Sequence, residues 1–352
     1  ARSLECRSRT ASRTTTPMSE YALSDPPTDG VTAVRFGPTG DSLAVTSWDA
    51  ALRLYDVASA DVVVRLPQPA PLLDVDFVDA GSVLSGATDG GLRLHGLETG
   101  VERVLGWHAS GVRCVRFCGA VGAGVSGSWD RSLKLWDVRT AEACVGTYAQ
   151  PDKVFALCVG APGAPPPPAP LVVVATAARH VHLLDLRRPS EPLQRRESAL
   201  KCQTRAVAQM PGGLGYALGS VEGRVAVEYV DPSAEAQARK YAFKCHRTVV
   251  DGVGTAFPVN AICYHPRHGT FATGGCDGHV NVWDGANKKR LCQLPRKPTS
   301  VAALAFSADG SRLAVAASYT YEMGERERAP DAVYVRTVAE AEVKPKAKRG
   351  DS

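Results

Sequence analysis

The side chains best suited to bind a ligand are two tryptophans and three cations. Trp48 and Trp129 each precede an aspartate in a short turn, where a structural turn needs only the Asp or a Gly. Arg205, Arg224 and Lys244 lie within 40 residues of one another, at the ends of short alternating segments. Flat aromatic rings bind apolar peptide surface, and Arg and Lys bind carboxylate or phosphate groups. These five residues therefore suit an extended peptide with an apolar part and an acidic or phosphorylated part.

Aspartates that recur along the chain could be mistaken for catalytic carboxylates. Four of them occupy the same position of successive turns, which is typical of structural turn residues: Asp49, Asp89, Asp130 and Asp277. Gly122–Gly127 matches the dinucleotide-binding pattern, but a strand and a Trp-Asp turn follow it instead of a helix. An enzyme would need a convergent catalytic set that the chain does not show. We therefore expect no catalytic residue, no metal and no cofactor.

A strand-like segment that recurs seven times indicates how the candidate residues are positioned. The copies are Leu52–Asp56, Leu92–Gly96, Leu133–Asp137, Val181–Asp185, Val225–Tyr229, Val280–Asp284 and Val333–Thr337. Apolar alternation with a period of two predicts strands. A spacing of about 40 residues, stretched to roughly 55 later in the chain, with Trp-Asp endings is typical of WD repeats. We predict an all-β, seven-bladed WD-repeat β-propeller.

The two ends of the chain bear on how the ring closes. The seventh unit, residues 299–338, supplies three strands and then stops. Residues 19–24 can supply its outer strand, which would remove an open sheet edge. We expect the propeller to occupy residues 18–340. Residues 1–17 are expected to be disordered or a non-native extension, and residues 341–352 a basic disordered tail.

Strand direction predicts that the five candidate residues share one face. If strands a to d of each unit alternate in direction, the b–c turns and the d–a connections lie on the same side of the ring. Trp48 and Trp129 occupy b–c turns, and Arg224 closes the b–c turn of the fifth unit. Arg205 begins the first strand of that unit and Lys244 ends its fourth. We predict a peptide-binding face centred on the fifth unit.

Composition disfavours several classes of partner. The chain has 41 Lys and Arg against 36 Asp and Glu, and clusters of cations occur in residues 1–17 and 344–349. The nearly neutral body does not favour direct nucleic-acid binding. No apolar run reaches the roughly 18 residues of a membrane span. The ten cysteines include no Cys-x-x-Cys pair, which is typical of reduced thiols. We expect a monomeric propeller with protein partners and no membrane contact.

Three segments of the fifth unit are specific to one family. Arg195–Arg205, Glu222–Tyr229 and Tyr241–Arg247 resemble the Bub-type mitotic spindle-checkpoint WD-repeat proteins, and the similarity extends from about Pro26 to Lys346. The resemblance implies a non-enzymatic spindle assembly checkpoint adaptor of the nucleus and kinetochore, with a possible cytoplasmic pool. It also implies binding to the GLEBS motif, a short acidic segment of checkpoint kinases and their pseudokinase relatives. The further partners it implies are phosphorylated Met-Glu-Leu-Thr repeats of a kinetochore scaffold and the mitotic checkpoint complex.

Carried over residue by residue, the resemblance implies two subsites. Trp48, Trp129 and Arg205 match the positions that contact the GLEBS peptide. Arg224 and Lys244 match the pair that binds the phosphothreonine.

The alternative is the related messenger-RNA export WD-repeat factor, which binds a GLEBS segment of a nuclear-pore protein. Tyr241–Lys244 and Ser318–Met323 favour the checkpoint branch. The fifth-unit segments also disfavour a generic ubiquitin-ligase substrate receptor. Cys202, where an aromatic residue is usual, and Gly96, where Asp is commoner, depart from the checkpoint pattern.

Overall fold

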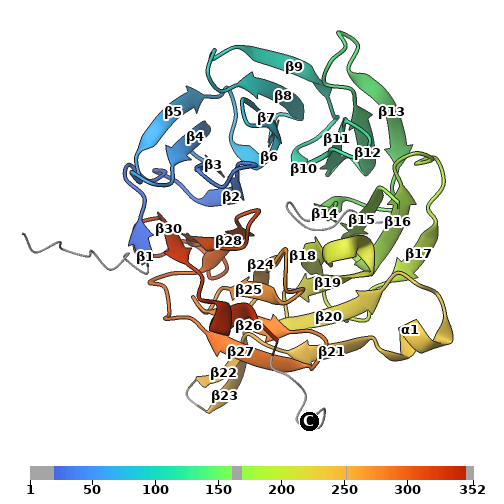
Figure 1. Cartoon of the computed structure of the whole chain (residues 1–352), viewed down its shortest axis with the longest axis vertical. Helices are drawn as coiled ribbons and strands as arrows, with labels where there is room; N and C mark the ends of the chain where they lie inside the picture. The colour runs from blue at the N-terminus through green and yellow to red at the C-terminus, as the bar shows by residue number, and fades with distance from the viewer. Residues whose placement is uncertain (1–19, 161–168, 251, 346–352) are drawn as a thin grey trace, which may run out of the picture.

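Seven antiparallel sheets are arranged as blades around a central channel in the computed structural model, which describes residues 20–160, 169–250 and 252–345 (Figure 1). Each blade has four strands, and its first strand lies nearest the channel. The predicted seven-bladed β-propeller is therefore confirmed.

The strands of each blade follow one another in the sequence, except in the last blade. Blade 1 contains β2 (Val31–Phe36), β3 (Ser42–Ser47), β4 (Ala51–Asp56) and β5 (Val62–Pro67). Blade 2 contains β6 (Leu72–Asp79), β7 (Ser82–Ala87), β8 (Gly91–Gly96) and β9 (Glu102–Trp107). Blade 3 contains β10 (Val112–Cys118), β11 (Ala123–Ser128), β12 (Ser132–Trp136) and β13 (Cys144–Ala149). Blade 4 contains β14 (Val154–Cys158), β15 (Leu171–Thr176), β16 (His180–Asp185) and β17 (Gln194–Glu197).

The remaining three blades include the closure of the ring. Blade 5 contains β18 (Thr204–Gln209), β19 (Gly215–Ser220), β20 (Arg224–Tyr229) and β21 (Tyr241–Lys244). Blade 6 contains β24 (Val259–Tyr264), β25 (Phe271–Gly275), β26 (Val280–Asp284) and β27 (Lys289–Gln293). Blade 7 contains β28 (Val301–Phe306), β29 (Arg312–Ala317), β30 (Ala332–Thr337) and, as its outer strand, β1 (Glu20–Ala22).

The core lies between the blades. All six residues of β15 are buried, because a neighbouring blade covers each face of this inner strand. The outer strand β5 instead alternates between half-buried and exposed residues. Apolar clusters join consecutive blades, as where Leu52 of blade 1 packs with Leu72 and Val75 of blade 2. Each such side chain contributes roughly 1.5–3 kcal/mol by leaving water.

The ring closes as predicted, by an N-terminal strand that completes the last blade. Residues Glu20, Tyr21 and Ala22 of β1 pair antiparallel with Arg336, Val335 and Tyr334 of β30. The Tyr21 hydroxyl donates to the Val57 carbonyl of blade 1, and Lys297 pairs with Glu20. This strand therefore joins the two ends of the propeller and pairs with the edge of β30 that would otherwise be open.

Several short elements lie outside the blades. A two-stranded hairpin, β22 (Arg247–Val250) and β23 (Val253–Ala256), connects blades 5 and 6 and was not predicted. The connection between β20 and β21 contains α1 (Ala234–Ala238), which begins after the capping residue Ser233. Two 3-10 turns, η1 (Ala177–Arg179) and η2 (Pro211–Gly213), complete these elements.

The C-terminal segment extends the packed body beyond the expected boundary at residue 340. In α2 (Glu340–Val343), the Val343 side chain is buried against blades 6 and 7. Its carbonyl accepts a hydrogen bond from the Thr270 hydroxyl at 2.7 Å. Residues 341–345 thus pack on the propeller, whereas 346–352 lie outside the described residues, as do 1–19 and most of the proline-rich insertion 161–170.

Candidate peptide-binding face

The recurring aspartates hold the b–c turns together. Asp49, Asp89, Asp130 and Asp277 each accept the backbone N–H two residues later, at 2.8–3.1 Å. Asp49 also pairs with the buried Arg53 at 2.7 Å. Burial opposes ionisation of Asp49, yet hydrogen bonds from Arg53, Ser47 and Thr28 lower its pKa to about 2. These carboxylates are already committed to turn geometry, so their structural interpretation agrees with the contacts.

These turns present Trp48 and Trp129 on the same face of the ring. The backbone N–H of Trp48 donates to the Gly30 carbonyl at 2.9 Å, and the backbone N–H of Trp129 donates to the Gly111 carbonyl at 3.1 Å. A Cβ atom on Gly111 would lie 2.8 Å from the Trp129 ring, and one on Gly30 would lie 3.3 Å from the Trp48 ring. The two glycines therefore leave room for the indoles directly before the inner strands of blades 3 and 1.

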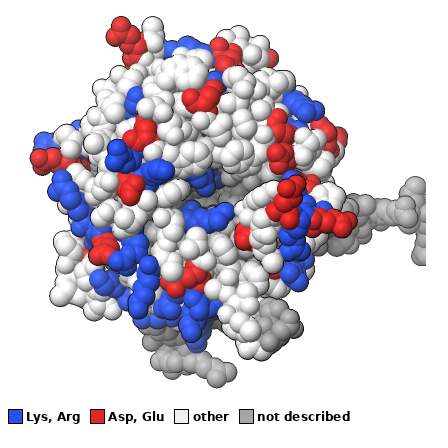
Figure 2. All heavy atoms as spheres, turned by 180° about the vertical axis from the view of Figure 1, so that it is seen from behind, with Lys and Arg blue, Asp and Glu red and all other residues white. Residues whose placement is uncertain are grey.

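The two indoles border a hollow at the centre of this face, with a volume of about 470 Å³. Figure 2 shows this face, which is the reverse of the one seen in Figure 1, with Lys and Arg atoms inside the hollow. Arg205 lines the hollow as well, so the structure brings together three of the five predicted residues. Trp48 is 46% exposed, whereas the indole Nε1 of Trp129 is buried and has no acceptor among the described residues. The hollow can thus offer aromatic surface and a cation.

Arg224 and Lys244 form a second group, which we call the rim pair. They are directly opposite each other in the ladder between β20 and β21, so their Cβ atoms are roughly 4.5–5.5 Å apart. Lys244 is exposed and Arg224 is half-buried. Within the described chain neither side chain has an ion-pair or hydrogen-bond partner, and the nearby Glu222 is paired with Arg247 at 3.5 Å. The rim pair does not line the hollow, so the five predicted residues separate into two subsites.

Prediction from the sequence missed other side chains that line the hollow. They are Leu73, Arg113, Asn260, Tyr319, Tyr321 and Arg328. Tyr319 and Tyr321 belong to the segment Ser318–Met323, and their ring centroids lie 5.9 Å apart. That segment carried the family resemblance, and its aromatic content could have indicated a binding role. Arg328 pairs with Asp29 at 3.4 Å and is therefore partly neutralised.

Comparison with known proteins decides the family. The model of the WD domain, G-beta repeat, matches residues 19–56, 101–137 and 243–284. Each matched stretch begins in the outer strand of one blade and ends with the third strand of the next blade. In the first stretch that outer strand is β1, which belongs to blade 7. Mitotic checkpoint protein BUB3.1 of Arabidopsis thaliana is 49% identical over 339 residues, covering 95% of this chain and 97% of that protein. The chain belongs to the Bub3 family of mitotic checkpoint proteins.

The chain is also similar to a messenger-RNA export protein and to a solved propeller structure. The Poly(A)+ RNA export protein of Schizosaccharomyces pombe is 32% identical over 342 residues, with 94% of each chain covered. The solved structure of U3-55K superimposes with a TM-score of 0.77 at 16% identity, covering 91% of this chain and 98% of that one. At this identity the likeness concerns the propeller fold alone. Bub3-family membership and the WD-repeat fold together support protein–protein interaction in the mitotic checkpoint.

Two other properties of the described residues bear on binding. No helix there combines the length and hydrophobicity needed to cross a bilayer. Cys114 and Cys118, the most closely spaced cysteines, are buried in β10, and burial raises the pKa of Cys114 to about 11. A protonated thiol inside a blade is a poor metal ligand.

Proposed function

We propose that this Bub3-family chain is a non-enzymatic spindle assembly checkpoint adaptor. It binds the GLEBS segments of a checkpoint kinase and a pseudokinase in the hollow, and phosphorylated Met-Glu-Leu-Thr repeats of a kinetochore scaffold at the rim pair. It works in the nucleus and at kinetochores during mitosis, where it contributes to the mitotic checkpoint complex. The observation that carries this proposal is that one face of the ring has two cationic subsites. The hollow also contains aromatic side chains, whereas the rim pair consists of cations alone.

The hollow has the properties that an acidic peptide segment requires. Trp48 and Trp129 provide large flat surfaces that bury apolar side chains at little cost in conformational entropy. Arg205 provides a guanidinium that is half-buried, where a carboxylate binds more strongly than it does in open water. A segment that combines apolar and acidic residues therefore matches both parts of the hollow.

The rim pair has the properties that a phosphate requires. Two cations side by side suit the charge of a phosphothreonine, which is between about −1.5 and −2 at pH 7. Because the rim pair has no acidic partner within the described chain, it does not have to break an internal ion pair to bind the phosphate. An unphosphorylated threonine would gain none of this charge interaction.

Calorimetry with two peptides tests the proposal. One is a GLEBS peptide and the other is a Met-Glu-Leu-Thr peptide with or without a phosphate on its threonine. The proposal predicts that the GLEBS peptide binds and that phosphorylation strengthens binding of the second peptide by at least tenfold, from one charge-assisted bond of about 1.5 kcal/mol or more. Equal affinity for the phosphorylated and unphosphorylated peptides would contradict it.

A second candidate is messenger-RNA export through a nuclear-pore GLEBS segment, favoured by the 32% identity to the export protein. Both candidates use the hollow, but only the checkpoint function requires the rim pair to bind phosphothreonine. Binding to the nuclear-pore segment together with no preference for the phosphopeptide would favour the export function.

A further inference from the structure

Two segments of blade 4 have the pattern Arg-Arg-x-Ser, and neither belongs to the peptide-binding face. They are Arg187–Ser190, in the connection between β16 and β17, and Arg195–Ser198, most of which lies in β17. A serine/threonine kinase with carboxylates in its substrate groove selects a serine that follows two arginines at this spacing, because each guanidinium pairs with an acid of the groove. The two segments share the pattern, so their structures decide which serine such a kinase can reach.

The second segment is held in the folded sheet. Arg196 belongs to the ladder between β16 and β17, and its guanidinium donates to the Val230 carbonyl at 3.1 Å. Ser198 is only 4% exposed, and its backbone N–H donates to the Arg179 carbonyl at 2.8 Å. Its hydroxyl accepts the backbone N–H of Leu200 at 3.2 Å. A kinase could bind this segment only after the outer strand of blade 4 had separated from the sheet.

The first segment is open. Arg187, Arg188 and Ser190 are all exposed. Asp185 fixes the start of the connection, because its carboxylate accepts the backbone N–H of Arg187 and its carbonyl accepts that of Arg188, both at 2.9 Å. Beyond this point, residues 189–193 make no hydrogen bond to any other described residue. A connection that is tied only at its start opens at little cost into the extended form that a peptide-binding groove requires.

Both arginines of the open segment are available to a kinase. The Nε of Arg187 lies 2.9 Å from the Asp185 carboxylate, but the Arg187 side chain is 58% exposed. An ion pair this exposed contributes little to stability, so Arg187 can exchange Asp185 for a carboxylate of the kinase. The side chain of Arg188 has no ion-pair or hydrogen-bond partner in the part of the chain that the structure describes. It therefore breaks no contact when a kinase binds.

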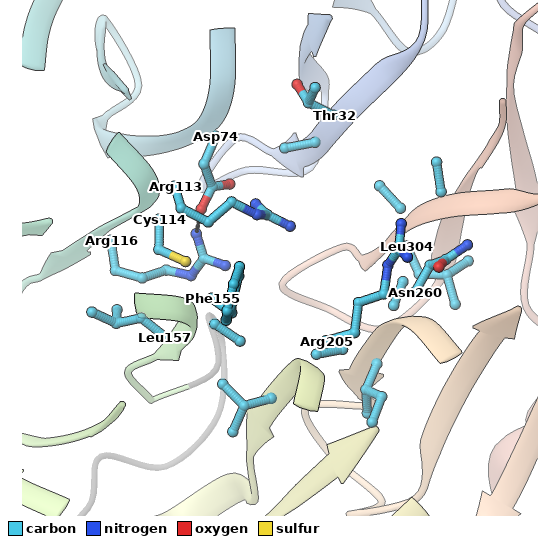
Figure 3. A pocket seen from close by; sticks show the side chains of 18 of the residues that line it. Thr32, Asp74, Arg113, Cys114, Arg116, Phe155, Leu157, Arg205, Asn260 and Leu304 are labelled. Carbon is cyan, nitrogen blue, oxygen red and sulfur yellow. Dashed lines mark hydrogen bonds and ion pairs between the residues drawn. The ribbon is translucent and has the colours of Figure 1, made fainter. Parts of the chain in front are cut away.

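The arginines of the central channel do not offer this access. Arg113, Arg116 and Arg205 extend into the channel from the inner strands β10 and β18 (Figure 3), and Arg116 pairs with Asp74 there. The β16–β17 connection instead joins the third strand of blade 4 to its outer strand, on the face of the ring opposite the hollow (Figure 1). A charge added at Ser190 therefore leaves the hollow and the rim pair unobstructed.

We propose that Ser190 is a phosphorylation site for a serine/threonine kinase that selects arginine two and three residues before the serine. The Ser190 Oγ bonds to the γ-phosphorus of ATP while the bond from that phosphorus to the β,γ-bridging oxygen breaks. ADP leaves, and the hydroxyl proton passes to the catalytic aspartate of the kinase. The product carries a charge between about −1.5 and −2 at pH 7, next to the unpaired Arg188. This site goes beyond the proposed adaptor function and does not depend on it.

Phosphorylation of the folded protein, measured serine by serine, tests the site. The full chain is incubated with ATP and the catalytic subunit of cyclic-AMP-dependent protein kinase, an enzyme of this class, and mass spectrometry follows the phosphate on each serine. Two peptides, residues 184–193 and 192–202, are treated in the same way, because each contains one of the two serines without the fold. The variants are Ser190→Ala, Arg188→Gln and, as the matched control in the second segment, Arg195→Gln.

Ser190 should be phosphorylated in the folded protein within about tenfold of the rate in its peptide, because the connection opens easily. Ser198 should be phosphorylated in its peptide but about 100-fold more slowly, or not at all, in the folded protein. Arg188→Gln should slow the reaction at Ser190 by about tenfold or more, the value of one charge-assisted bond. Arg195→Gln should not change that rate, and Ser190→Ala should remove the phosphate from residues 184–193.

Two results would overturn the site. The first is a folded protein without phosphate on Ser190. If the peptide 184–193 is then modified, the connection does not open, and if it is not, Arg187 and Arg188 are not recognised. The second is an equal loss at Ser190 for Arg188→Gln and Arg195→Gln, since the kinase would then respond to the charge of the whole region. Neither result bears on peptide binding, which calorimetry tests separately.

Discussion

The hollow and the rim pair both present cations to a ligand, but they differ in how far those cations are exposed to water. Arg205 is half-buried among aromatic side chains at the centre of the ring, whereas Lys244 is exposed at its edge. Charges in a hollow interact strongly over short distances and are screened little by salt, while exposed charges are screened. The hollow is therefore suited to stable binding of one partner, and the rim pair to a contact that depends on phosphorylation.

The largest effect should follow from reversing the charge in the hollow. In Arg205→Glu, a half-buried cation becomes an anion that repels the acidic peptide, so GLEBS affinity should fall by more than about 100-fold. A pull-down and calorimetry with the GLEBS peptide measure this. The control with the same charge change is Arg267→Glu, at an exposed residue of the β24–β25 loop on the opposite face of the ring. Unchanged GLEBS binding would mean that Arg205 does not contact the peptide.

Removing either member of the rim pair should give a smaller and more selective effect. Arg224→Ala or Lys244→Ala removes one charge-assisted bond to the phosphate, so affinity for the phosphopeptide should fall about tenfold. GLEBS binding should stay nearly the same, because the rim pair does not line the hollow. Titration of both peptides into both variants checks the separation. Equal losses for the two peptides would show that the subsites are not distinct.

Crowding one indole should weaken GLEBS binding alone. In Gly111→Ala, the new methyl group would lie 2.8 Å from the Trp129 ring and force it to move, so we expect a loss of a few-fold to about tenfold. Gly30→Ala, with 3.3 Å to Trp48, should have a smaller effect. Phosphopeptide affinity should not change in either variant. If Gly111→Ala leaves GLEBS binding intact while the folded state is preserved, Trp129 is not part of the GLEBS subsite.

The smallest expected difference between the two subsites is in how their peptide affinities depend on salt concentration. Raising ionic strength from about 0.1 M to 0.5 M shortens the screening length and should weaken phosphopeptide binding several-fold. GLEBS affinity should change less, since apolar contacts contribute and Arg205 is half-buried. Titrations at three salt concentrations measure the two slopes. A steeper slope for the GLEBS peptide would contradict the assigned difference in burial.

Much of this arrangement could be predicted from the repeats. The third strand of every blade has alternating apolar residues, and its spacing predicts the ring, the closing strand and the face on which Trp48 and Trp129 lie. Arg113 was missed because a bulge interrupts the period of two, so the alternation pattern assigns its side chain no particular direction. The hairpin β22–β23 was not predicted because it belongs to no repeat. The short helix α2 was not predicted because it depends on the packing of Val343 against blades 6 and 7.

The claim that one face carries two separate subsites is tested most directly by titrating the phosphopeptide into protein already saturated with the GLEBS peptide. Because the hollow and the rim pair share no residue, the phosphopeptide should bind the saturated protein with an affinity equal to or higher than its affinity for the free protein. Loss of phosphopeptide binding in the saturated protein would show that the two peptides compete for one site, and would contradict the account.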